Sequence, residues 1–197
     1  LPAVNGPIIR QSANWPSRWQ KMAEISDARE FLPVNIAVLT VSDTRTLDDD
    51  RSGDMLADRL DGAGHILAAR EIVKDDIDTI AAKLTEYIEN SDIDVVITTG
   101  GTGVTGRDVT PEAFAKVCEK EISGFGELFR MLSFEKIGTS TIQSRATAGV
   151  AGGTYLFALP GSPSACRDGW DDILVHQLDY RFMPCNFVEL MPRLTEK

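Results

Sequence analysis

The amino-acid sequence predicts an α/β fold of three layers, in which a mostly parallel central sheet is flanked by helices. Short apolar runs rich in valine and isoleucine alternate with longer segments whose apolar residues recur at helical spacing. Glycine, proline and aspartate separate these segments, as is typical of βαβ units. The 197 residues, of which 43% are hydrophobic, suffice for one domain with a substantial core.

The first half of the chain predicts two strands, each followed by a helix. Residues 34–41 form an apolar run typical of a strand covered on both faces. Ser52 is a candidate cap for a helix that ends at the glycines of positions 62 and 64. Residues 68–73 predict the next strand, and Asp75 and Asp76 open the helix after it.

The second half repeats the pattern. Residues 93–99 predict a buried strand, after which Thr110 is the expected N-cap of a helix and Pro111 its first residue. Residues 155–159 predict a further strand, and the turn at residues 160–165 leads into the last long helix.

Two segments allow simple interpretations. Residues 124–134 are denser in apolar side chains than a surface helix requires. We expect a core helix there, with a subunit interface as the alternative. Residues 48–50, three consecutive aspartates, are expected to form a solvated loop.

The domain organisation follows from the regularity of the pattern. Residues 1–33 lack a clear period and are expected to be an arm or extension, partly disordered, with Trp15 and Trp19 available to dock on a neighbouring subunit. Residues 34–190 form the single predicted α/β domain, and residues 191–197 form a C-terminal tail.

Composition limits the classes of function. The net charge of −10 argues against nonspecific nucleic-acid binding, which relies on a basic surface. No apolar run reaches transmembrane length and no segment resembles a signal peptide, so we expect a cytoplasmic protein without a membrane partner. Three cysteines without a CxxC pattern argue against a zinc site. Neither His65 nor His176 has an evident partner for acid–base catalysis.

The glycine-rich segment after the third predicted strand carries the strongest functional signal. It contains Thr99, Gly100, Gly101, Thr102 and Gly103, and it leads to a capped helix. Glycines let the backbone approach a ligand closely, and a helix N-terminus attracts anions. By themselves, however, the glycines also fit an ordinary strand-to-helix turn.

Charged residues near this turn extend the signal. Arg107 and Asp108 follow it closely, and a carboxylate beside a phosphate site often indicates a divalent metal ion. Ser42, Asp43 and Asp75 also fall at predicted strand ends. Because ligands bind at the carboxyl ends of parallel strands, we expect these residues to share one site.

A second turn offers another candidate anion site. Pro160, Gly161 and Ser162 follow a predicted strand, and Ser162 can cap a helix or contact a phosphate. This turn alone also fits an ordinary connection between a strand and a helix.

The sequence TTGGTG followed by RDVTPEA resembles the signature of the molybdopterin-binding family of molybdenum cofactor biosynthesis proteins, the MoaB/MogA type. The LPGSP segment around Gly161 and the pair Ser144 and Arg145 resemble further motifs of that family. The resemblance covers about residues 34–187 and is closer to the MoaB branch. It implies a fold of the molybdopterin-binding-domain type, with Asp75 and Asp108 as the catalytic carboxylates.

The resemblance also implies a reaction, the transfer of AMP from ATP to the terminal phosphate of molybdopterin. Asp75 and Asp108 would hold Mg²⁺. Substrate would be bound by the residues of the glycine-rich turn together with Ser42, Asp43, Arg107, Ser144, Arg145 and Pro160–Ser162. The nucleophile is an ionised phosphate oxygen, so that no general base is needed. The family further implies a homo-oligomer, either a trimer or a hexamer.

Other functions remain as alternatives. A non-catalytic molybdopterin carrier, or a scaffold for other cofactor-synthesis proteins, would share the same fold. A nicotinamide-dependent oxidoreductase is a poor alternative, since no GxGxxG follows the first strand. A P-loop nucleotidase is also a poor one, because the chain has no GK[ST].

Overall fold

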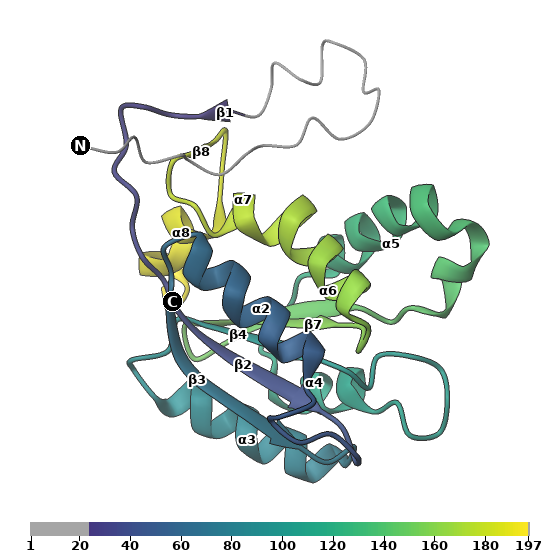
Figure 1. Ribbon diagram of the computed structural model, residues 1–197. Coiled ribbons are helices and arrows are strands. Elements are labelled where there is room, and N and C mark those ends of the chain that lie inside the picture. The colour runs from purple at the N-terminus through teal and green to yellow at the C-terminus, as the bar shows by residue number, and fades with distance from the viewer. Residues whose placement is uncertain (1–23, 197) are drawn as a thin grey trace.

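A six-stranded mixed sheet forms the middle layer of the computed structural model, which describes residues 24–196 (Figure 1). Its strands are β2 (Asn35–Val41), β3 (Ile66–Val73), β4 (Val95–Thr99), β5 (Lys120–Glu121), β6 (Thr147–Ala151) and β7 (Thr154–Leu159). They lie in the order β3-β2-β4-β7-β6-β5. The first four are parallel, whereas β6 is antiparallel to both of its neighbours. The expected mostly parallel sheet is therefore confirmed.

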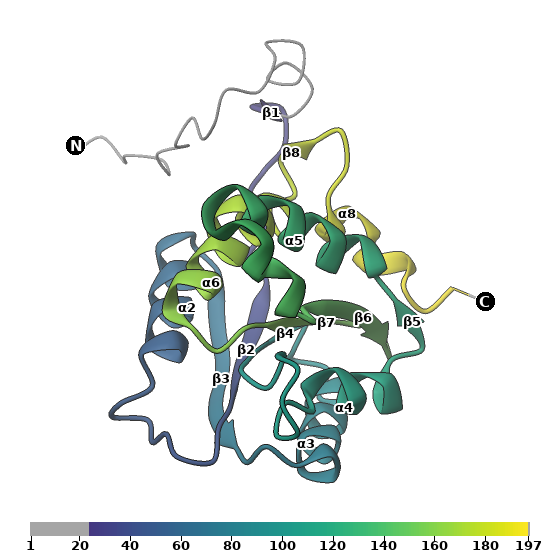
Figure 2. The same ribbon diagram turned by 90° about the vertical axis from the view of Figure 1, so that its right-hand side faces the viewer.

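Helices cover both faces of this sheet, which completes the three predicted layers (Figures 1 and 2). One face carries α3 (Ile77–Glu89) and α4 (Thr110–Val117). The other carries α2 (Arg51–Gly62), α5 (Ser123–Ile137) and a continuous helical run made of α6 (Pro163–Gly169), η2 (Trp170–Leu174) and α7 (Val175–Gln177). The run was expected as one helix, but its η2 part is a π-helical turn.

Alternation along the strands divides the core between the two faces. Ile36 and Val38 of β2 pack with α2 residues such as Leu60 in one fully buried cluster. Ala37 and Leu39, which point the opposite way, pack with α3 residues in the second cluster. Because both faces of β2 are covered, the strand is apolar on both sides, apart from Asn35 at its start and the buried Thr40.

The starts of two helices, α2 and α4, differ from the expectation. Asp50 caps α2, accepting a hydrogen bond from the Gly53 N–H at 3.0 Å, and it is only 2% exposed. The prediction of a solvated loop is therefore wrong for this residue. Ser52, the expected cap, instead donates to the Gly161 carbonyl at 2.8 Å. Thr110 is the first residue of α4 and donates to the Gly100 carbonyl at 2.8 Å, so its hydroxyl ties the helix to the glycine turn.

Both ends of the described chain contact the domain. The strand β1 (Glu24–Ile25) pairs with β8 (Phe182–Met183), and Arg29 forms an ion pair with Glu189 at 3.2 Å. That glutamate lies in α8 (Phe187–Leu190), which is followed by η3 (Met191–Arg193). Met191 and Leu194 pack against the core. The expected docking role of Trp15 and Trp19 lies outside the described residues.

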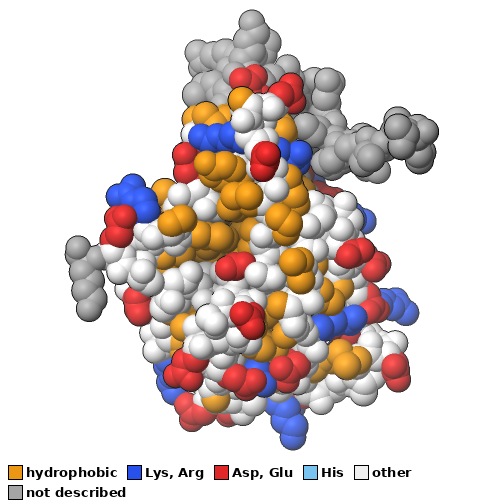
Figure 3. All heavy atoms as spheres, turned by 90° about the vertical axis from the view of Figure 1, so that its left-hand side faces the viewer, with side chains coloured by type: hydrophobic (Ala, Val, Ile, Leu, Met, Phe, Trp, Pro, Cys, Tyr) orange, Lys and Arg blue, Asp and Glu red, His pale blue; other side chains and the backbone are white. Residues whose placement is uncertain are grey.

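The left-hand side of Figure 1 is bounded by β3, the outer strand of the sheet. Figure 3 looks onto this side and shows apolar side chains gathered in its upper half. Ile66 and Leu67, at the start of β3, are 51% and 40% exposed. Among the helices formed by residues 24–196, none is long and apolar enough to cross a membrane.

Candidate functional site

The carboxyl ends of the four parallel strands bring the predicted site residues to one edge of the sheet. Strand β2 leads to Ser42 and Asp43, β3 to Asp75, β4 to the glycine turn and β7 to Gly161. The Asp75 N–H donates to Asp43 at 3.3 Å. The Gly100 N–H donates to the Leu159 carbonyl at 3.0 Å, which joins the ends of β4 and β7.

Ser144 and Arg145 reach the same edge by a different route. They precede β6, and because β6 runs antiparallel to β7, its beginning lies beside the end of β7. The Arg145 N–H donates to the Thr102 carbonyl at 2.8 Å. The antiparallel strand thus adds a fifth segment to an edge otherwise formed by strand ends.

The glycine turn depends on conformations that suit glycine. Gly100 and Gly101 have φ of 106° and 65°, in the left-handed region. A Cβ on Gly100 would lie 2.2 Å from the Val41 carbonyl oxygen, and one on Gly101 would lie 2.4 Å from Thr110 Oγ1. The absence of a Cβ at these two positions therefore permits close packing between chain segments, in addition to the approach of a ligand that the sequence predicted.

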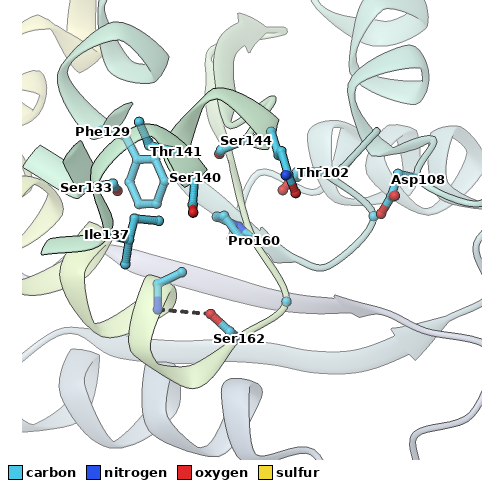
Figure 4. A pocket seen from close by; sticks show the side chains of 15 residues that line it. Thr102, Asp108, Phe129, Ser133, Ile137, Ser140, Thr141, Ser144, Pro160 and Ser162 are labelled. Carbon is cyan, nitrogen blue, oxygen red and sulfur yellow. Dashed lines mark hydrogen bonds between the residues drawn. The ribbon is translucent and has the colours of Figure 1, made fainter. Parts of the chain in front are cut away.

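A cavity of about 340 Å³ opens beside the turn (Figure 4). Eight predicted site residues line it, namely Gly101, Thr102, Gly103, Asp108, Ser144, Pro160, Gly161 and Ser162. The opposite wall comes from α5 and from η1 (Gly138–Gln143), with Phe129, Ser133, Ile137, Ser140, Thr141 and Gln143. Figure 4 shows this wall facing Pro160 and Ser162 across the cavity. The lining is rich in hydroxyl groups, and Asp108 is its one charged side chain among the described residues.

The hydrogen bonds of the turn leave donors for a ligand. The carbonyls of Gly100, Gly101 and Thr102 accept from Thr110 Oγ1, the Thr110 N–H and the Arg145 N–H. The N–H groups of Gly101 and Thr102 have no acceptor in the part of the chain that the structure describes. Successive backbone N–H groups that lack an acceptor within the protein form good anion-binding sites.

The remaining charged residues form a second group beside the turn, outside the cavity lining. Asp75 Oδ1 would lie 3.1 Å from a Cβ on Gly101, so the carboxylate is close to the turn. Burial raises the pKa of Asp75, and the charges of Asp43 and Asp108 raise it further. Arg107 pairs with Asp43 at 3.6 Å, but its side chain is 79% exposed. Negative charge therefore accumulates around Asp75 with little compensation.

Asp108 is held inside its own loop. Its Oδ2 accepts hydrogen bonds from the Thr105 N–H at 2.8 Å and from the Thr105 hydroxyl at 2.6 Å. Although burial opposes the effect, these bonds lower the pKa of Asp108, which keeps the carboxylate ionised. The bonds fix the carboxylate beside the cavity (Figure 4).

Two of the predicted substrate ligands are engaged elsewhere. Thr99 is fully buried, with its hydroxyl 3.1 Å from the Pro160 carbonyl and 2.9 Å from Cys166 Sγ. Arg145 contacts the loop after the turn and does not line the cavity. The structure thus places both residues in supporting positions.

The wall formed by α5 and η1 was not predicted from the sequence. Ser133, Ser140 and Thr141 belong to no recognisable motif, and hydroxyl residues are common on any surface helix. Phe129 and Ser133 are four residues apart on α5, and their spacing on one helical face was the available signal.

The histidines and cysteines lie outside this site, except for Cys166 beneath it. Burial lowers the pKa of His65 to about 4, against the effect of Asp179, and burial also lowers that of His176. Burial raises the pKa of the Cys166 thiol to about 11, so it is not a ready nucleophile.

The carboxylates near the turn are compatible with Mg²⁺ bound together with a phosphate ligand. Within residues 24–196, no three histidine, cysteine, aspartate or glutamate side chains form a group able to hold a metal ion. Mg²⁺ is, however, commonly bound through one or two carboxylates together with substrate phosphates. The negative charge around Asp75, which Arg107 offsets only in part, fits a divalent cation that arrives with a phosphate ligand.

Comparisons with known proteins converge on one group. A family described as "Probable molybdopterin binding domain" matches residues 37–180. The chain is 51% identical over 166 residues to molybdenum cofactor biosynthesis protein B of Escherichia coli (strain K12), which covers 84% of this chain and 96% of that protein.

Solved structures agree with this result. A crystal structure of a molybdenum cofactor biosynthesis protein B matches with a TM-score of 0.77 and 39% identity, and the match covers 86% of this chain and 100% of that chain. A MogA structure has a TM-score of 0.64 and 32% identity, covering 73% of this chain and 97% of that one. The chain is thus more similar to these protein B relatives than to that MogA.

Proposed function

The chain belongs to the molybdopterin-binding family of molybdenum cofactor biosynthesis, and we propose that it transfers AMP from Mg-ATP to the terminal phosphate of molybdopterin. The observation that carries this proposal is the cavity at the carboxyl edge of the sheet. There, the N–H groups of Gly101 and Thr102, which have no acceptor within residues 24–196, adjoin a hydroxyl-rich wall and the carboxylate of Asp108. An anion at the turn and a polar heterocycle against the wall suit such a lining.

The chemistry requires positioning more than proton transfer. The attacking oxygen belongs to a phosphate that is already ionised at neutral pH, so the site needs no general base. What it needs is an oriented pair of substrates and donors for the developing charge. The N–H groups of the turn orient the phosphate, and Ser162 and Ser144 offer hydroxyls beside it.

Asp75 and Asp108 are the residues that would hold Mg²⁺. The ion supplies charge neutralisation for the phosphates of ATP. The raised pKa of Asp75 reflects burial and repulsion from neighbouring carboxylates, and a bound cation relieves such repulsion. Asp43 contributes to the same negative field, and it pairs with the exposed Arg107, whose guanidinium would be available to a phosphate.

The test is an adenylylation assay with purified protein, molybdopterin, ATP and Mg²⁺, in which the adenylylated product is followed by chromatography. We expect Mg²⁺-dependent product from the wild type and a loss of at least about 100-fold in Asp75→Asn and Asp108→Asn. Asp78→Asn is the matched control, because Asp78 is an exposed carboxylate on α3 that pairs with Lys116. Equal turnover in all three variants would remove the two carboxylates from the mechanism.

A molybdopterin carrier or scaffold without turnover is the second candidate. The contacts of Asp108 favour it, because the carboxylate already closes the loop through Thr105 and could serve that role alone. In that case the protein binds molybdopterin in an equilibrium measurement but yields no product with ATP and Mg²⁺. Asp108→Asn would then weaken binding only as far as it loosens the loop.

We also propose that the chain forms a homo-oligomer, a trimer or a hexamer as the family resemblance implies. The helix α5 and the following η1 expose large apolar side chains, among them Leu128, Met131, Phe134 and Ile142. Apolar surface of this kind favours burial against another copy. Sedimentation of the wild type and of Met131→Glu tests the proposal, since a charge in a buried interface should lower the mass of the particle.

A further inference from the structure

We infer that Arg145 and Glu112 form a clamp that positions the loop of residues 103–108, and that neither side chain contacts the substrate. This inference rests on the proposed function, since it concerns the loop that carries Asp108. The family resemblance gave Arg145 a substrate-binding role, and Glu112 had no assigned role. The contacts of the two side chains give them a different task.

The guanidinium of Arg145 spans both ends of the loop. Its Nε donates to the Gly103 carbonyl at 2.6 Å, and its Nη2 donates to the Asp108 carbonyl at 2.6 Å. Its Nη1 donates to a carboxylate oxygen of Glu112, which projects from the first turn of α4. Each nitrogen of the guanidinium therefore has a partner in the protein.

The contacts also decide what the loop presents to a ligand. A carbonyl of Gly103 or Asp108 that is bound by Arg145 cannot turn its lone pairs toward an incoming anion. Because one planar group holds both carbonyls, the two ends of the loop stay at a fixed spacing, and the Asp108 carboxylate keeps its place. If the guanidinium were released, both carbonyl oxygens would be free to turn toward the ligand, and their partial negative charge would repel an anion.

Two observations argue against direct substrate binding by Arg145. Neither Arg145 nor Glu112 lines the cavity. The charge of Arg145 is already balanced by Glu112, whose pKa is lowered by the hydrogen bond from Arg145, against the effect of burial. Glu112 has its hydrogen bond to Arg145 and does not line the cavity, which makes it the more informative residue to change.

The geometry of the clamp requires arginine. The rigid fork of a guanidinium can hold two carbonyls and one carboxylate at once, whereas an ammonium is a single point of charge. Arg145→Lys should therefore lose the clamp although it keeps the positive charge. A residue that contacts phosphate by charge alone would tolerate this change far better.

The first experiment is amide hydrogen exchange on the wild type, Arg145→Lys, Glu112→Ala and the control Asp78→Ala. The control removes another exposed carboxylate that pairs with α4, at Lys116, but leaves the loop contacts intact. We expect exchange in residues 103–109 to become about tenfold faster in the two clamp variants only, since local opening releases these groups. Unchanged exchange in Arg145→Lys would overturn the clamp, whether or not the protein has turnover.

The second experiment uses the adenylylation assay and requires turnover in the wild type. We expect kcat to fall by about tenfold to 100-fold in both clamp variants, because loss of position in a catalytic group is costly. The double variant should be no worse than Arg145→Lys alone, since both changes release the same loop. Multiplying effects, or a rise confined to the KM of molybdopterin in Arg145→Lys, would refute the clamp and indicate direct binding.

Discussion

Protonation of His65 should destabilise the fold as the pH falls below neutrality. The imidazole is only 5% exposed and packs between the rings of Phe31 and Trp170, at centroid distances of 5.2 and 6.0 Å. Its Nδ1 accepts a hydrogen bond from the Val34 N–H at 3.2 Å. A proton on Nδ1 would put two donors face to face and bury a charge.

The magnitude follows from the shift in pKa. Burial lowers the pKa of His65 from its ordinary value of 6.5 to about 4, although the nearby Asp179 charge acts in the opposite direction. Between these two values the unfolded chain binds the proton more readily, so acid favours unfolding. The stabilisation is complete above pH 6.5 and is lost as the pH falls toward 4. Proton linkage over this interval lowers the free energy of unfolding by about 2 kcal/mol between pH 7 and pH 4.5.

The assay is urea unfolding of the wild type and of His65→Asn at both pH values, followed by circular dichroism. The amide oxygen of asparagine can accept from the Val34 N–H, but asparagine does not titrate. Carboxylates distant from His65 titrate in the same way in both proteins, so their contribution cancels in the difference. We expect the wild type to lose about 2 kcal/mol more than the variant. Parallel losses would refute the assignment of the pH dependence to His65.

Two further substitutions test the packing around the site. Gly101→Ala should destabilise the protein by more than about 1 kcal/mol in calorimetry, because φ is 65° and the new Cβ would lie 2.4 Å from Thr110 Oγ1. Gly106→Ala is its control, as no atom lies within 4 Å of the added Cβ, and it should leave stability nearly unchanged. Asp50→Ala should cost about 2 kcal/mol in urea unfolding, because it removes a helix cap and the carboxylate that pairs with Arg70 at 3.2 Å. A loss below about 0.5 kcal/mol would mean that solvent replaces both contacts.

The sequence was sufficient for the layers and for much of the site. The apolar run of residues 34–41 predicted a strand covered on both faces, and the structure has one at Asn35–Val41, because such a run is a local property of the sequence. Convergence of Asp43, Asp75 and Gly101 followed from a general rule for parallel strands, without knowledge of any contact. The sequence therefore predicted the order of the strands and helices, and it predicted which polar residues lie at the carboxyl edge of the sheet.

The details that depended on contacts between distant segments could not be predicted. Thr110 and Ser52 both resembled helix caps, but each donates to a carbonyl across the site edge that only the folded chain brings near. Asp50 resembled its exposed neighbours, yet Thr40 and Arg70 supply buried partners for it. Helix-capping propensity reflects only the residues adjacent in sequence, whereas the hydrogen-bond partners of these three side chains come from segments that are distant in sequence.

The connection between β6 and β7 has a practical consequence for engineering. This turn, with Gly152 and Gly153 at φ of 56° and 93°, lies at the edge of the sheet opposite to Pro160 and the glycine turn. The length of β7 therefore separates it from the candidate chemistry. A reporter group or a short peptide inserted there would be carried on the far rim of the sheet, where it could follow the protein without obstructing the cavity.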